Sequence, residues 1–216
     1  MESISDPAQQ QSHLDHLCST SLAQATGYLP LLQLKLTCQT KLSPRNDRDI
    51  VAAADAILDS IDQKELAAFL FFPTRSGDAI DKKDKNAVKL RDKNQELKMI
   101  LINALFAKAV ALSNLISSGV TELRQQFINT YILLTDWTDT KSDSKFTELK
   151  VTIDIMRGNT GSALANLNKA IGNSRTKSTL QKRILFLKNL GGMYLDIADR
   201  EELSVLAEFP ASFRIS

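Results

Sequence analysis

The sequence predicts an all-α protein of stacked antiparallel helical hairpins, a tetratricopeptide-like superhelical array. Residues 96–118 carry apolar side chains at alternating spacings of three and four, the period of an amphipathic helix, with no Pro or Gly before Gly119. Shorter segments of the same period follow one another, separated by turn residues. The apolar positions of the long segment are Leu97, Ile100, Leu101, Ala104, Leu105, Ala111, Leu112 and Leu115.

The composition is that of an ordinary globular protein. Of 216 residues, 43% are apolar and 24% charged, so a core can form. The net charge of +2 gives no argument for nucleic acid or a membrane surface as a partner, and no apolar run reaches the roughly 18 residues that span a bilayer. The first residues are too polar for a signal peptide. Cys18 and Cys38 are predicted to be reduced thiols in a cytoplasmic protein.

The first third of the chain predicts a short tail and then several helices. Residues 1–12 are expected to be a flexible N-terminus, and residues 13–216 a helical repeat domain. A short helix is expected after Asp6-Pro7, with a break at Gly27. In residues 28–40 apolar and polar residues alternate as in a strand, but the apolar positions also fit a helix with Pro30 in its first turn. The helix is preferred because no second strand lies nearby to pair with it.

Two capping signals follow. Ser43-Pro44 predicts an N-cap and first-turn Pro for a helix over residues 47–61. Asp62 and Glu65 resemble a capping box that opens a short helix to Leu70. Residues 81–98 are rich in Lys, but acidic residues interleave and no aromatic is present, which favours a solvated helical lead-in over a nucleic-acid site.

The second half predicts further helices in sequence. They cover residues 123–136, 146–156, 160–171, 178–195 with a kink or close packing point at Gly191-Gly192, and 199–209. Gly158, Ala163-Leu164 and Ala170-Ile171 match the offsets of a tetratricopeptide second helix. The preceding helix lacks the matching aromatic and Gly positions, so this is a degenerate repeat.

Candidates for chemistry are few. His13, His16, Cys18 and Cys38 could be imagined as metal ligands, but their spacing lacks the paired pattern of a zinc site. Asp136 and Asp139 flank Trp137, and we interpret them as residues at a helix end rather than as paired catalytic carboxylates. No nucleophile, base or phosphate-loop motif occurs. The sequence therefore predicts no catalytic residue, no cofactor and no metal.

Several separate stretches, taken together, resemble the C-terminal helical region of tripeptidyl-peptidase II. Their order and approximate spacing match from about residue 10 to the end, more loosely between Gly119 and Thr130 and at the C-terminus. The stretches are Tyr28-Leu29-Pro30-Leu31, Ala53-Ala54-Asp55-Ala56, Ser60-Ile61-Asp62-Gln63, Asn103-Ala104-Leu105, Lys108-Ala109-Val110-Ala111-Leu112, Asp136-Trp137-Thr138-Asp139 and Leu187-Lys188-Asn189-Leu190-Gly191.

The resemblance implies a scaffold of tetratricopeptide-like helices within a giant cytosolic serine exopeptidase that removes tripeptides from free N-termini of oligopeptides. In that family the catalytic Asp, His and Ser belong to a subtilisin-like domain that this sequence does not match, so no catalytic residue is carried over. The implied partners are upstream regions or other subunits of a large homo-oligomer. The alternative is a free-standing adaptor, for which Asn166, Lys169 and Asn173 give a faint hint of a peptide groove; a self-contained enzyme ranks last.

Overall fold

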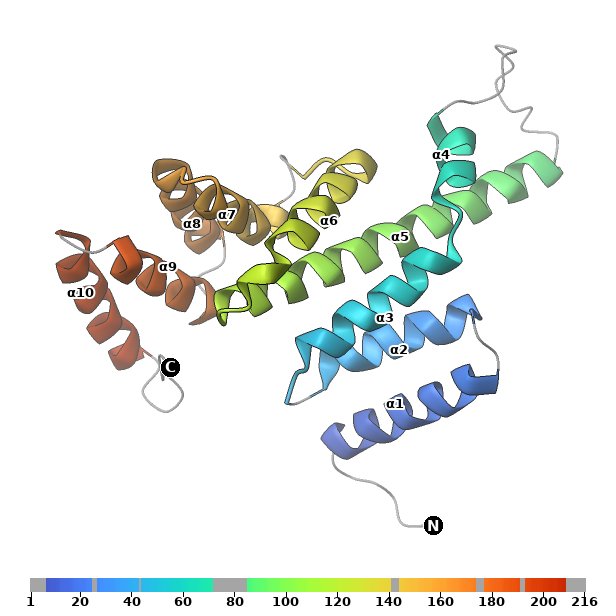
Figure 1. The fold of residues 1–216 in the computed structure, drawn as a ribbon, viewed down its shortest axis with the longest axis horizontal. Helices are drawn as coiled ribbons and strands as arrows, with labels where there is room; N and C mark the ends of the chain where they lie inside the picture. Colours follow the sequence, from blue (N-terminus) through green and yellow to red (C-terminus); the bar gives the residue numbers. More distant parts are fainter. Residues whose placement is uncertain are drawn as a thin grey trace. The chain divides into compact units, whose positions relative to one another are not determined.

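The computed structural model confirms the all-α class. It describes residues 7–24, 27–42, 44–71, 85–140, 144–173, 177–190 and 193–208, and these ranges contain helices and turns but no strand (Figure 1). The chain divides into two compact units, Met1–Thr138 and Asp139–Ser216. Each unit is described below by itself.

The first unit is organised around one long helix, as the sequence predicts. Its helices pack in chain order: α1 on α2, α2 on α3, α3 on α5 and α5 on α6, with α4 also on α5. The charged lead-in of residues 85–95 continues directly into the predicted apolar segment, so α5 is longer than that segment alone. The elements are α1 (Pro7–Gln24), α2 (Leu29–Lys41), α3 (Asp47–Ser60), α4 (Gln63–Phe71), α5 (Lys85–Ser117), the 3₁₀ turn η1 (Thr121–Leu123) and α6 (Arg124–Trp137).

The core of this unit lies between α3 and α5. Ile50, Ala54 and Ile57 of α3 are buried, and so are the apolar residues in the middle of α5. Alanines at both helices allow the backbones to approach closely while Leu and Ile fill the remaining space. On α5 the fully buried side chains are Leu101, Ala104, Leu105, Ala109, Ala111 and Leu112.

Two glycines end helices as the sequence predicts. Gly119 has φ 103° and Gly158 has φ 74°, a left-handed conformation that residues other than Gly rarely adopt. After α5, the N–H of Gly119 donates to Ile116 O (3.1 Å) and that of Val120 to Leu115 O (3.0 Å). This pair of bonds is a Schellman motif, which satisfies carbonyls left over at the helix end. Gly158 and Asn159 make the equivalent bonds after α7.

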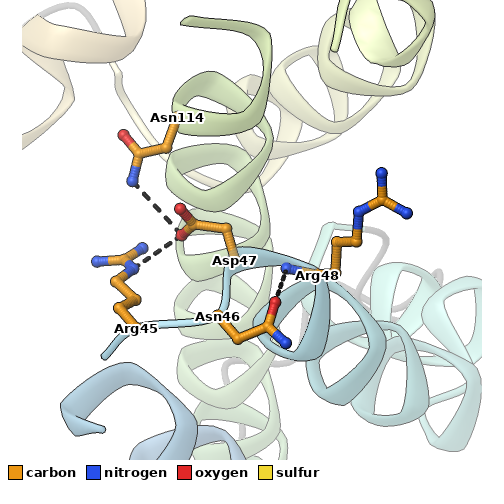
Figure 2. A network of polar contacts seen from close by, with 5 residues as sticks. All are labelled: Arg45, Asn46, Asp47, Arg48 and Asn114. Atoms are coloured by element: carbon orange, nitrogen blue, oxygen red, sulfur yellow. Dashed lines mark hydrogen bonds and ion pairs between the residues drawn. The ribbon is translucent and has the colours of Figure 1, made fainter. Parts of the chain in front are cut away.

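Two N-caps were predicted, and one of them is wrong. Asp62 caps α4 as expected, since its Oδ1 accepts from the N–H groups of Lys64 and Glu65, both at 3.0 Å. At α3 the cap is Asn46, whose Oδ1 accepts from Arg48 N at 3.1 Å (Figure 2). Pro44 lies before the helix, and Ser43 lies outside the described residues. Asn is as good a cap as Ser, and Asn46 stands directly before the apolar period begins.

The second unit contains four helices that also pack in chain order, α7 on α8, α8 on α9 and α9 on α10. Ala163 and Leu167 of α8 pack with Val151 of α7 and Phe186 of α9. A second cluster joins α9 to α10. The elements are the 3₁₀ turn η2 (Ser144–Phe146), α7 (Thr147–Met156), α8 (Thr160–Asn173), α9 (Lys177–Leu190) and α10 (Met193–Glu208).

The prediction for the end of the chain is wrong. Instead of one kinked helix over residues 178–195 and a short one over 199–209, there are two helices, α9 and α10, of similar length. The boundary falls at Gly191-Gly192, which lies outside the described residues. Tyr194 and Leu195 therefore belong to α10. Leu187 of α9 packs in one cluster with Ala198 and Val205 of α10, so the chain turns back between these two helices.

The length and apolar composition of the long helix α5 would also suit a membrane-spanning helix. Its stretch Val88–Ser117 is long and apolar enough to cross a bilayer by length and composition alone, which the count of uninterrupted apolar residues did not show. The core helix of a globular domain can have the same length and apolar composition. Here the middle of α5 is buried against α3 and α6.

Candidate interaction surfaces

The four candidate metal ligands differ in their exposure to solvent, the two histidines being exposed and the two cysteines buried. His13 and His16 lie on the exposed side of α1, whereas Cys18 and Cys38 are buried and form no disulfide. Among the residues that the structure describes, no group of three or more His, Cys, Asp or Glu side chains could hold a metal ion. Buried cysteines of this kind pack as small apolar residues.

The residues around Trp137 form the C-terminal end of helix α6. Trp137 is the last residue of α6 and is buried, with 7% of its surface exposed. The N–H of Thr138 donates to Leu134 O at 3.1 Å, which completes the last turn. The Asp136 side chain is exposed at the end of α6, and Asp139 is an exposed residue at the start of the second unit.

Polar contacts fix the register of α3 on α5. Lys108 Nζ of α5 donates to Asp55 Oδ1 of α3 at 2.5 Å. Near the start of α3, Asp47 Oδ1 accepts from Arg45 Nε at 2.8 Å and from Asn114 Nδ2 of α5 at 3.4 Å (Figure 2). Moving along α3 from Asp47 to Asp55 thus corresponds to moving backwards along α5, so the two helices are antiparallel.

In the second unit, the residue that suggested a peptide groove is used for helix packing. Asn166 Nδ2 donates to Asp154 Oδ2 at 2.9 Å, and Ser162 Oγ donates to the same oxygen at 2.7 Å. These bonds join α8 to α7. Lys169 is exposed, and the side chain of Asn173 lies outside the described residues. Asn166 therefore supports the scaffold rather than a groove for a peptide.

Two ion pairs join α9 to α10. Arg183 pairs with Glu201, and Lys188 pairs with Glu202. The hydrogen bond to the Glu202 carboxylate raises the pKa of Lys188 above its ordinary 10.5, and burial only partly opposes this effect. The pairs hold the hairpin together along its side, next to the apolar cluster.

In the described part of the basic run of residues 81–98, acidic and basic residues share one surface hollow. A surface hollow of about 580 Å³ lies along the N-terminal part of α5. Two acidic and two basic residues line it, so its charge is mixed. The described lining residues are Asn86, Lys89, Leu90, Asp92, Lys93 and Glu96.

The hydrophobic periodicity of the sequence did not predict which leucines are exposed on the surface. On α1, Leu14 and Leu17 are 42% and 47% exposed. On α10, Leu195, Leu203 and Leu206 are 43%, 68% and 37% exposed. Large apolar side chains exposed together on one helix are typical of a surface that contacts something else. The sequence signal was present as a second apolar row on each helix, but periodicity alone does not tell which row faces the core.

Comparison with known proteins gives two related chains. No family model matches, and no solved structure matches. The chain is 28% identical over 198 residues to Tripeptidyl-peptidase 2 of Oryza sativa subsp. japonica, covering 86% of this chain and 14% of the relative. It is 27% identical over 221 residues to Tripeptidyl-peptidase 2 of Arabidopsis thaliana, covering 94% of this chain and 15% of the relative.

The chain thus spans only a small part of the length of these relatives, while they match most of it. The resemblance seen in the separate stretches of sequence is confirmed by these alignments. This chain is a distant relative of tripeptidyl-peptidase II along most of its length.

Proposed function

We propose that this chain forms a non-catalytic helical scaffold of a tripeptidyl-peptidase II-like serine exopeptidase in the cytoplasm, which releases tripeptides from free N-termini of oligopeptides. Its partners would be upstream regions or other subunits of a large homo-oligomer. Packing in chain order, with α3 on α5 in the first unit and each helix on the next in the second, supports a tetratricopeptide-like stack of antiparallel hairpins within each unit.

The observation that carries the proposal is the place of the family-like residues in the structure. Asp55 and Lys108 pair across α3 and α5, Asp62 caps α4, and Leu105 and Trp137 are buried. Residues in such positions hold helices together and do not perform chemistry. What this chain shares with the peptidase is therefore best explained as a common scaffold.

The adaptor reading has less support. Its sequence hint included Asn166, and that side chain is bonded to Asp154 within the fold. A free-standing adaptor would present polar side chains on an open concave face.

The proposal is tested by purifying the tagged full-length chain from cells and assaying the eluate with a reporter from which a tripeptide is cleaved. We expect the chain to bring down a larger peptidase and its activity. A tagged chain that is recovered without the activity, although the activity is present in the unbound fraction, would contradict the proposal.

A further inference from the structure

The last described helix, α10, carries an apolar row that remains partly exposed in the structure. At about 100° per residue, Leu195, Leu203 and Leu206 fall within about 80° of one another around the helix. They are 43%, 68% and 37% exposed. Ala198 and Val205 occupy a different face and are buried against α9. Helix α10 is thus apolar on two faces, of which one is packed on α9, the helix next to it in Figure 1.

Acidic side chains accompany the exposed row. At the same helical spacing Asp199 falls between the three leucines, and Asp196 lies at their edge; both are exposed. Arg200 directs its Nε to the backbone oxygen of Asp196 at 3.1 Å, and Lys188 of α9, which pairs with Glu202, also interacts electrostatically with Asp199. We call Leu195, Asp196, Asp199, Leu203 and Leu206 the leucine–aspartate face.

The combination of exposed leucines and neighbouring carboxylates determines which kind of partner the face can bind. An apolar partner would bury the exposed Asp196 and Asp199 carboxylates against a surface that offers them no hydrogen bond, which is costly. A second copy using the same face would bring Asp196 and Asp199 close to like charges, and an anionic lipid surface would be repelled as well. A helix with leucines between Lys or Arg residues fits, because its long basic side chains cover apolar surface and place their charged ends near carboxylates.

We propose that the leucine–aspartate face of α10 binds a basic amphipathic helix of a protein partner. The leucines of the two helices pack together in the manner of helix-in-groove recognition, and Asp199 and Asp196 accept from the partner's Lys or Arg side chains. This binding site is independent of membership in a peptidase assembly, and it goes beyond the scaffold role.

The test measures binding of the full chain to two labelled synthetic helical peptides of equal length by fluorescence anisotropy. One peptide carries Leu and Lys at helical spacing, the other Leu and Glu. We expect the Leu/Lys peptide to bind and the Leu/Glu peptide to bind at least about tenfold more weakly. Leu203→Glu and, separately, Asp199→Lys each weaken Leu/Lys binding about tenfold or more, since a buried leucine contact and a charge pair are lost.

The matched control is Leu185→Glu on α9, where an equally apolar side chain is 40% exposed outside this face. That variant binds the Leu/Lys peptide like the wild type, and circular dichroism shows all variants folded. Equal binding by wild type, Leu203→Glu and Asp199→Lys would overturn the proposal. So would sedimentation showing a wild-type dimer that Leu203→Glu dissociates, because the face would then belong to a second copy.

Discussion

Lys108 Nζ lies 2.5 Å from Asp55 Oδ1, and this ion pair connects α5 to α3. The two residues are 53 positions apart and come from different stretches among those that resemble tripeptidyl-peptidase II. Their side chains are 13% and 38% exposed, so the pair lies at the edge of the helix interface. Each of the two stretches thus supplies one half of a contact that sets the register of two helices.

Replacing Lys108 by Met removes the donor to Asp55, and we expect a loss of about 1 kcal/mol in the free energy of unfolding, because the pair is only partly shielded from water. Urea unfolding followed by circular dichroism measures the loss. Arg91→Met is the matched control: Arg91 and Asp92 are 3.5 Å apart, their side chains are 48% and 65% exposed, and no measurable change is expected. Equal losses in the two variants would contradict this reading of the α3–α5 contact.

Asn46→Ala removes the N-cap of α3. The Asn46 side chain accepts from Arg48 N and donates to Asp49 Oδ2 at 2.7 Å, so the substitution should lower the free energy of unfolding by about 1 kcal/mol. Asn46→Ser keeps a capping oxygen and should lose less than half of that. Ser43→Ala tests the cap that the sequence suggested, and a loss there as large as in Asn46→Ala would refute the assignment.

Gly158→Ala should destabilise the second unit through the backbone alone. The φ of 74° is unfavourable for Ala by about 1 kcal/mol, although no atom lies within 4 Å of the added methyl group. Gly161→Ala is the comparison within α8, where the same methyl group also meets no atom within 4 Å and helix propensity favours Ala by up to about 1 kcal/mol. Thermal unfolding should therefore shift in opposite directions, and a shared direction would argue against the left-handed turn.

The Lys188–Glu202 pair predicts a pH dependence. The pKa of Lys188 is raised above 10.5 in the folded chain by the Glu202 carboxylate, so the charged form stabilises the fold below the unfolded pKa. That stabilisation is lost as the pH rises through the folded pKa. The difference in unfolding temperature between wild type and Lys188→Met should be constant up to about pH 10 and shrink above it. A difference that persists unchanged to the highest pH would show that packing of the Lys188 side chain, not its charge, is responsible.

Much of the fold could be predicted because local signals agree with it. The period of residues 96–118, the glycines at 119 and 158 and the cap at Asp62 each act within one or two turns, and the structure confirms all of them. The division of the C-terminal residues into α9 and α10 could not be predicted, since a double glycine permits a kink as readily as a turn. The α9–α10 cluster that distinguishes the two outcomes is a contact between helices.

The candidate surfaces were harder to predict than the helices. The sequence prediction put Leu195 in one helix and Leu203 and Leu206 in the next, and a helix with two apolar rows can pack through either of them. Only the contacts of Ala198 and Val205 with α9 show which row is left exposed. In the same way Asn166 looks available in the sequence until Asp154 of the preceding helix is brought against it.

The most direct test of the scaffold role is the native size of the endogenous chain in a cell extract, measured by gel filtration with an antibody against it. The same fractions are assayed for cleavage of a tripeptide reporter substrate. The proposed role predicts that the chain elutes in a very large assembly together with the activity. Elution near its own mass of 23.9 kDa, in fractions without activity, would contradict it.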